Sequence, residues 1–230
     1  MSTYVFMICW KVFLVRVPKG FSLERARRIQ RVFAGRVLFR DVDLESVRLV
    51  AGFDVSYGEG YAFSVVAVVD FRTLEVFEVR SVRVRVRFPY IPTLLSFREA
   101  PPIFKVFRML SCHPDVLMVD GHGVLHPYGC GLASHVGVVL GMPTIGVAKN
   151  LLCGRVGEYV GNKAPIFLDG KVAGMAVITK PKTKPIYVSV GNMITLDKAV
   201  KIVEKCVKKS RIPEPIRIAH ILTKTFREKN

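Results

Sequence analysis

The sequence predicts an α/β fold in which a mixed β-sheet is flanked by helices, within a single domain over residues 1–230. Two observations lead to this prediction. Three long β-type segments follow one another in the first half, and helix-type and strand-type segments alternate afterwards. The 230 residues are 50% hydrophobic, enough for one large core, and no linker-like or repeated stretch divides them.

The first predicted element is a basic amphipathic helix that begins after Ser22. Serine is a good N-cap, and the apolar residues that follow it fall on one helical face, while arginines occupy the others. The apolar residues are Leu23, Ala26, Ile29, Val32 and Phe33.

Three predicted strands follow, over residues 47–57, 61–71 and 74–88. They are rich in β-branched and aromatic residues, and Gly58 and Gly60 mark a tight turn between the first two. We expect an antiparallel meander.

The rest of the chain alternates between the two types of element. A helix is expected from about Pro101, followed by a strand that ends at Asp120, a helix over 132–142, a strand over 144–149 and a last amphipathic helix over 195–210. A three-stranded meander followed by this alternation describes a ribonuclease H-like mixed sheet.

Charge and cysteine content restrict the partners and the compartment. With 35 Lys and Arg against 18 Asp and Glu, the formal net charge is +17, which attracts polyanions such as nucleic acid. Five cysteines without a CxxC pair favour reduced thiols in a cytoplasm. The apolar N-terminus lacks a basic start and a cleavage site, and Lys11 and Arg16 interrupt it, so we expect neither export nor a membrane span.

Two aspartates are predicted to lie on neighbouring strands. Asp120 follows four apolar residues, as at the end of a central strand whose last residue faces a crevice. Asp54 sits within the apolar run LVAGFDVSY, where an unpaired charge would cost several kcal/mol. A turn-holding aspartate is the alternative for Asp54. We favour a pair of carboxylates that shares a cation.

Glu99 is a third candidate carboxylate. Ser96 and Glu99 spell S-x-x-E, which is also the capping box of a helix start. Because Pro101 and Pro102 suit a fresh helix start better than a helix interior, we expect Glu99 in a short irregular segment, free to coordinate. Three converging carboxylates require a divalent cation, and oxygen ligands favour Mg²⁺, with Mn²⁺ able to substitute. The alternative is a zinc site, formed by His122, His126, Cys130 and His135.

Two further residues are placed near these carboxylates. His126 lies in a loop rich in glycine that follows Asp120, and it either orients a phosphate or water or serves only as a hydrogen-bond partner. Lys149 follows the strand TIGVA and should emerge beside Asp120, where it can hold a phosphate; a solvent-exposed lysine is the alternative. Gly121 and the other loop glycines would let a flat ring approach the backbone.

A stiff apolar segment and a row of arginines precede Glu99. Pro89, Tyr90, Ile91 and Pro92 form an extended prong whose tyrosine can stack on a base, or else an ordinary connection with a core tyrosine. The strand before it alternates Arg83, Arg85 and Arg87 with valines. That row indicates either a charged edge strand or contacts to phosphates, and the edge strand is at least as well supported.

Several separated motifs resemble endonuclease V: VAGFDVSY, PYIPTLLSFREAP, VDGHGVLHPYGCGLASHVGV, PTIGVAKN, YVSVGN and RIPEPIRIAH. They occur in the family's order from about Leu44 to His220. The resemblance implies a ribonuclease H-like fold and a Mg²⁺-dependent DNA repair enzyme that recognises deoxyinosine. It further implies hydrolysis of the second phosphodiester bond 3′ to the lesion, leaving 3′-OH and 5′-phosphate ends.

Carried over to this chain, the resemblance assigns roles to individual residues. The metal-binding carboxylates are Asp54, Glu99 and Asp120, and His126 and Lys149 assist near the phosphate. The residues Pro89, Tyr90, Ile91 and Pro92 become a wedge that fills the gap left by the extruded base, and main-chain groups near Leu95, Gly121 and Leu132 form the base pocket. Thr93 stands where the family usually has glycine, and His220 matches a residue near the site.

Two other functions fit the same sequence. One is a nuclease of the same fold that acts on inosine in RNA or on a broader range of structures, because discrimination of the 2′-hydroxyl is not visible in sequence. The other is a non-catalytic nucleic-acid-binding protein, against which three carboxylates facing a phosphate argue. We expect a monomer.

Overall fold

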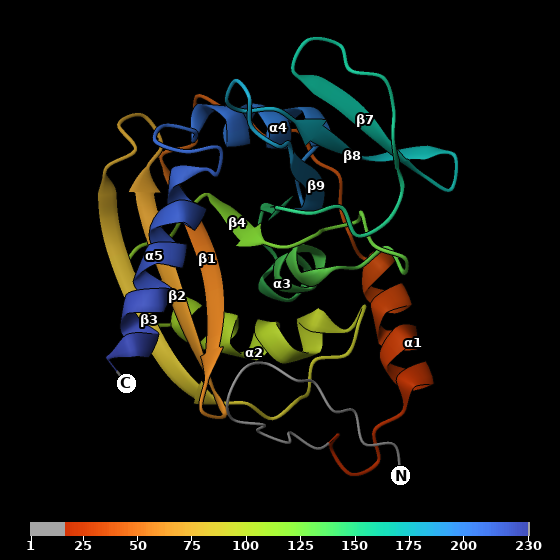
Figure 1. Cartoon of the computed structure of the whole chain (residues 1–230), viewed down its shortest axis with the longest axis vertical. Coiled ribbons are helices and arrows are strands. Elements are labelled where there is room, and N and C mark those ends of the chain that lie inside the picture. Colours follow the sequence, from red (N-terminus) through yellow and green to blue (C-terminus); the bar gives the residue numbers. More distant parts are fainter. Residues whose placement is uncertain (1–16, 230) are drawn as a thin grey trace.

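The computed structural model describes residues 17–229, and a nine-stranded mixed sheet forms its centre (Figure 1). The strand order is β3-β2-β1-β4-β5-β9-β8-β7-β6. The strands are β1 (Leu49–Gly58), β2 (Tyr61–Asp70), β3 (Val76–Arg85), β4 (Val116–Asp120), β5 (Thr144–Ala148), β6 (Arg155–Val156), β7 (Lys163–Leu168), β8 (Lys171–Val177) and β9 (Ile186–Asn192). The helices are α1 (Leu23–Ala34), α2 (Leu95–Phe107), α3 (Leu132–Leu140), α4 (Leu196–Lys205) and α5 (Glu214–Glu228).

The predicted fold class and the predicted meander are confirmed. Strands β1, β2 and β3 pair antiparallel in sequence order, whereas β1 pairs parallel with β4, and β4 with β5. The register places Phe53 opposite Val119 and Asp120 opposite Val147. The C-terminal ends of β4 and β5 therefore lie side by side, next to the middle of β1, where Asp54 is located.

Helices cover both faces of the sheet. Valines and isoleucines of one face pack against α4 and the start of α5, and residues of the other face pack against α2 and α3. Figure 1 shows α5 lying along β1 and β2. Gly52 allows this close approach, because a Cβ at that position would lie 2.2 Å from the backbone carbon of Pro215.

Helix α1 begins where the sequence predicts, but it buries different residues. The Ser22 side chain accepts a hydrogen bond of 3.2 Å from the backbone N–H of Arg25. Of the expected apolar face, Ala26 is buried, while Ile29 and Val32 are exposed. The other buried residue is Gln30, because polar backbone groups of two loops lie beneath this helix.

The predicted start of the second helix is wrong. Helix α2 begins at Leu95, so Glu99, Pro101 and Pro102 all lie inside it. A proline in a helix interior costs about 3 kcal/mol because it removes a hydrogen bond. Here Ala100, Ile103 and Val106 on the same helix are buried in the core, and this packing outweighs the cost.

The sequence reading also missed the last helix. The predicted final helix over 195–210 ends at Lys205, and α5 follows it after a short connection. Strands β6 to β9 were also not among the predicted strands, and they extend the sheet beyond β5. Within residues 17–229, no helix is both long and apolar enough to cross a membrane.

Candidate active site and metal centre

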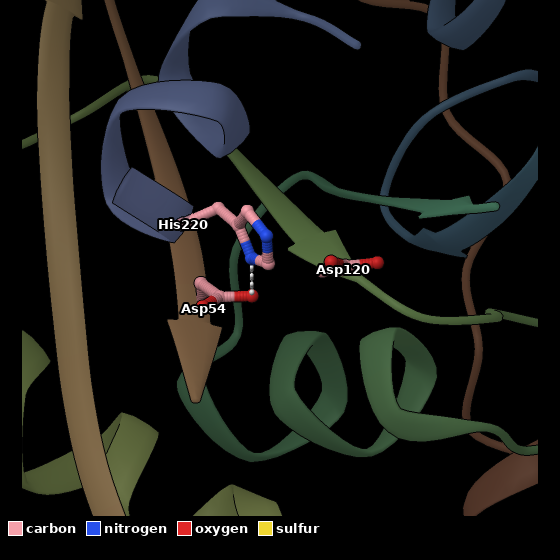
Figure 2. A group of neighbouring side chains, drawn as sticks. All are labelled: Asp54, Asp120 and His220. Atoms are coloured by element: carbon pink, nitrogen blue, oxygen red, sulfur yellow. Dashed lines mark hydrogen bonds and ion pairs between the residues drawn. The ribbon is translucent and has the colours of Figure 1, made fainter. Parts of the chain in front are cut away.

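Two aspartates and a histidine converge where β1 and β4 meet. Potential ligand atoms of Asp54, Asp120 and His220 all lie within 4.8 Å of one another. Figure 2 shows the two carboxylates on the two adjacent strands, with the His220 ring reaching over from α5. The strand pairing explains the carboxylate pair, and the packing of α5 on β1 adds the histidine.

Asp54 is buried and held by two side chains of α5. His220 Nδ1 lies 3.3 Å from Asp54 Oδ1, and the Thr223 hydroxyl donates to Asp54 Oδ2. Thr223 is itself fully buried. Hydrogen bonds of this kind compensate the cost of burying a carboxylate and fix its orientation. Thr223 was not predicted from the sequence because α5 was not expected. The one indication of such a residue was that a buried Asp54 needs hydrogen-bond partners.

Asp120 is paired with Lys149. Lys149 Nζ lies 2.6 Å from Asp120 Oδ2. The register brings them together because Lys149 directly follows β5, whose Val147 is opposite Asp120. Burial raises the pKa of Asp120 above its ordinary value, and the ammonium of Lys149 partly offsets this effect.

Glu99 lies beside Asp54, Asp120 and His220 but is not one of the three residues whose ligand atoms lie within 4.8 Å of one another. Its Oε1 accepts a hydrogen bond of 3.3 Å from the Tyr57 hydroxyl. Burial raises the pKa of Glu99 to about 8, and the negative charges of Asp120 and Asp54 add to the increase. A cation bound between the carboxylates would reverse this effect by favouring their charged forms.

The donor set fits a hard divalent cation. Three carboxylates from β1, β4 and α2 repel one another when charged, and the positive charge of one ion would relieve that repulsion. Carboxylate oxygens with one nearby imidazole suit Mg²⁺ or Mn²⁺. Strand patterns predicted Asp54 and Asp120, and the family resemblance placed His220 near the site. The structure groups potential ligand atoms of these three residues.

His126 is buried in the glycine-rich loop that follows Asp120. Its Nε2 lies 3.1 Å from the Thr93 carbonyl oxygen, and its Nδ1 accepts from the backbone N–H of Tyr128 at 3.2 Å. Both ring nitrogens therefore contact backbone groups. Burial lowers the pKa of His126 to about 4, which keeps the ring neutral. His126 thus positions two loops against each other.

Gln30 of α1 joins the same two loops. Its Nε2 donates to the carbonyl oxygens of Thr93 at 2.7 Å and Cys130 at 3.3 Å. Thr93 has a φ of +70°, a conformation that strains a β-branched residue and favours glycine. The side chains of Gln30 and His126 hold the Thr93 carbonyl in this strained turn.

The glycine-rich loop is shaped mainly by contacts within the protein. Of its four glycines only Gly129 has a positive φ, and a Cβ at Gly123 would lie 1.9 Å from the carbonyl oxygen of Val190. A Cβ at Gly121 would lie 3.4 Å from the side chain of Leu132, which is an ordinary contact distance. Leu95 packs in the same apolar cluster as Leu132. A base pocket formed by main-chain groups near these three residues stays a prediction.

The predicted prong lies between β3 and α2, and its residues alternate in exposure. Pro89 and Ile91 are buried, whereas Tyr90 and Pro92 are exposed. Tyr90 is therefore not a core tyrosine, and its role as a wedge stays a prediction. Phe88 and Ile91 pack against Ala26 and Leu94, so the inner half anchors the segment and Tyr90 remains 43% exposed.

Comparisons with known proteins agree on one family. The profile of endonuclease V matches residues 31–221. Endonuclease V of Thermofilum pendens is 47% identical over 216 residues, which cover 94% of this chain and 93% of that protein. The crystal structure of endonuclease V from Streptomyces avermitilis has a TM-score of 0.85 at 36% identity and covers 94% of this chain and 98% of its own.

A third relative was solved with nucleic acid. Ciona intestinalis endonuclease V, in complex with a 24mer DNA containing an inosine followed by a ribo-adenosine, matches with a TM-score of 0.83 at 30% identity. The match covers 90% of this chain and 98% of that chain.

Proposed function

The chain belongs to the endonuclease V family, and from this premise we propose that it is a DNA repair endonuclease that recognises deoxyinosine. It hydrolyses the second phosphodiester bond 3′ to the lesion in a Mg²⁺-dependent reaction and leaves 3′-OH and 5′-phosphate ends. The observation that carries the proposal is the convergence of Asp54, Asp120 and His220, with Glu99 beside them. A protein that only binds nucleic acid would lose affinity from such a concentration of carboxylates.

Asp54, Glu99 and Asp120 are the proposed metal ligands. When bound, the divalent ion supplies activation of a water molecule and charge stabilisation of the leaving 3′ oxygen. Thr223 and His220 orient the carboxylate of Asp54, and Tyr57 orients that of Glu99. Each ligand thus has a partner that fixes its direction before the ion arrives.

Lys149 has two partners in the proposed reaction. In the protein alone its ammonium neutralises Asp120 at 2.6 Å. With a divalent cation bound at Asp120, the ammonium of Lys149 would be free to hold the phosphate that undergoes hydrolysis, at the same edge of the sheet. His126 is proposed to assist near the same phosphate, while its ring also contacts the carbonyl of Thr93.

The lesion is read beside this centre. We assign the base pocket to main-chain groups near Leu95, Gly121 and Leu132, and the wedge to the segment from Pro89 to Pro92, with Tyr90 as the side chain that stacks. Extrusion of a base costs a few kcal/mol, and a mispaired inosine lowers this cost. The bound inosine-containing DNA of the Ciona relative supports this substrate class.

The test is cleavage of an end-labelled duplex that contains one deoxyinosine, in Mg²⁺ and in EDTA. Mn²⁺ should substitute for Mg²⁺. A matched ribo-inosine strand distinguishes DNA repair from processing of inosine in RNA, and an undamaged duplex controls for general nuclease activity. Tight binding without any cleavage in Mg²⁺ would reject the proposal in favour of a non-catalytic role.

A further inference from the structure

A second concave surface lies between strand β3 and helix α2, apart from the carboxylates. It is a groove of about 390 Å³. We call it the β3–α2 groove. Its floor includes apolar side chains of α2, among them Phe97, Pro101 and Pro102. It begins at Phe88, the residue that immediately precedes the proposed wedge.

The β3–α2 groove is lined by cations and by no Asp or Glu. The cationic residues are Arg83, Arg85, Arg87, Arg98 and Lys105. Two of them have protein partners: Arg83 stacks over the ring of Tyr61, and Arg98 stacks over that of Tyr57. The other three are exposed, and within the described part of the chain their side chains form no hydrogen bond or ion pair. Their charge is therefore open to a ligand.

Protection of an edge strand does not account for this arrangement. β3 is an edge strand of the sheet, and charged residues on such strands prevent pairing with another molecule. Lys105, however, lies on α2 and contributes its charge from the opposite wall of the groove. Charges on both walls above an apolar floor suit the sugar-phosphate backbone of a nucleic acid, which presents regular negative charge next to apolar sugar surface.

The β3–α2 groove is also connected to the candidate active site. Arg98 lines the groove, its guanidinium lies 4.1 Å from the centre of the Tyr57 ring, and the Tyr57 hydroxyl donates to Glu99. Arg98 also donates to the carbonyl of Phe88 at 3.5 Å. β3 lies two strands from β1, and the register leads from Asp54 through Val65 to Ser81. On β3 the groove lies further along the chain, from Arg83 onward, and extends towards the proposed wedge.

We propose that the β3–α2 groove is a second nucleic-acid site, which binds the phosphodiester backbone flanking the lesion on the side of the wedge. The proposal rests on the proposed function, because the positions of the wedge and the carboxylates define where the bound strand runs. Phosphate contacts at Arg85, Arg87 and Lys105 hold the substrate in register while the base is extruded. They contribute affinity for any sequence and do not take part in the chemical step.

The test compares two triple variants that remove the same charge. In one, Arg85, Arg87 and Lys105 are replaced by alanine; in the other, Lys180, Lys182 and Lys184, on a loop remote in sequence, are replaced. Fluorescence anisotropy measures the Kd for an undamaged labelled duplex over a range of salt concentrations. A charge-preserving variant, Arg85→Lys with Arg87→Lys, serves as the rescue, and thermal unfolding confirms that each variant is folded.

We expect the groove variant to bind about 100-fold more weakly at 0.1 M salt and to lower the slope of log Kd against log salt by about 2 to 3, because each lost phosphate contact removes about 0.7–0.9. The lysine-loop variant and the rescue variant should keep a slope near that of wild type. Equal slopes for the groove variant and the lysine-loop variant would overturn the proposal.

Cleavage separates this proposal from the proposed function. On a deoxyinosine duplex the groove variant should raise KM and leave kcat unchanged, since its residues do not touch the carboxylates. If wild type binds through the groove but never cleaves inosine DNA, the proposed function fails and the second site stands. If wild type cleaves and the groove variant matches it in Kd and KM, the second site fails alone.

Discussion

Thr223 offers a sharp test of how the site is built, because its hydroxyl and its methyl group do different things. Thr223 is fully buried, and its hydroxyl donates to Asp54 Oδ2 while lying 3.0 Å from the carbonyl oxygens of Ala219 and His220. A hydroxyl has a single proton, and a carboxylate is the strongest of these three acceptors. Thr223→Val keeps the shape of the side chain and removes that hydrogen bond.

The magnitude follows from the kind of bond that is lost. A hydrogen bond to a charged group contributes about 1.5–3 kcal/mol. If all of it orients Asp54 in the transition state, cleavage slows by about 10- to 150-fold, at about 1.4 kcal/mol for each factor of ten. Because Asp54 keeps its contact with His220, we expect a value near the lower end, about 10-fold.

Thr223→Ser is the matched control. It keeps the hydroxyl and loses a buried methyl group, which lowers the free energy of unfolding by about 1 kcal/mol. Single-turnover cleavage of a deoxyinosine duplex, with a Mg²⁺ titration and thermal unfolding, should rank the serine variant above the valine variant in rate. A valine variant that cleaves at the wild-type rate, or a serine variant that is as slow as valine, would refute the role of the hydroxyl.

Three further predictions concern residues around the site. Thr93→Gly should raise the free energy of unfolding by up to about 1 kcal/mol, because glycine accepts the φ of +70° at little cost. Thr93→Ala is the control that keeps the backbone strain. If thermal unfolding shows that alanine stabilises the protein as much as glycine does, relief of strain is not the cause. Gly52→Ala should displace α5, lower the free energy of unfolding by about 1–3 kcal/mol and slow cleavage, because the new Cβ would lie 2.2 Å from the Pro215 backbone. Gly35→Ala is the tolerated control, since Gly35 has a φ of −69° and the nearest atom to an added Cβ is 3.6 Å away. A Gly52→Ala enzyme with normal activity would count against the placement of α5. In metal-free protein the pKa of Glu99 is raised, so the folded state keeps a proton that the unfolded state releases above about pH 4.5. The free energy of unfolding, measured with urea in EDTA, should therefore fall as the pH rises towards 8, and Glu99→Gln should flatten this dependence. An unchanged dependence in the Glu99→Gln variant would show that Glu99 is not its source.

The sequence predicted those parts of the fold that have strong local patterns. The strands around Asp54 and Asp120 read clearly because runs of β-branched and apolar residues surround each carboxylate, and their pairing followed from the order of elements. The start of α2 was predicted wrongly because Pro101 and Pro102 are local signals against a helix, and the burial of Ala100 and Ile103 overrides them. Tertiary packing decides such cases, and a single sequence does not display it.

The residues that hold the candidate site together were the hardest to foresee. Thr223 and Gln30 act on groups that lie 169 and 63 residues away along the chain, so no local pattern marks them. His126 stood out in the sequence because of its glycine-rich loop, yet the structure engages both of its ring nitrogens with backbone. A histidine in a promising loop therefore has to be judged by what its two nitrogens contact.

The most direct measurement of the central claim is the position of the nick on an end-labelled duplex with a single deoxyinosine, compared between wild type and Asp120→Ala in Mg²⁺ and in EDTA. We expect one Mg²⁺-dependent nick at the second phosphodiester bond 3′ to the inosine in wild type and none in Asp120→Ala. An Asp120→Ala protein that nicks this duplex at the wild-type rate would contradict it.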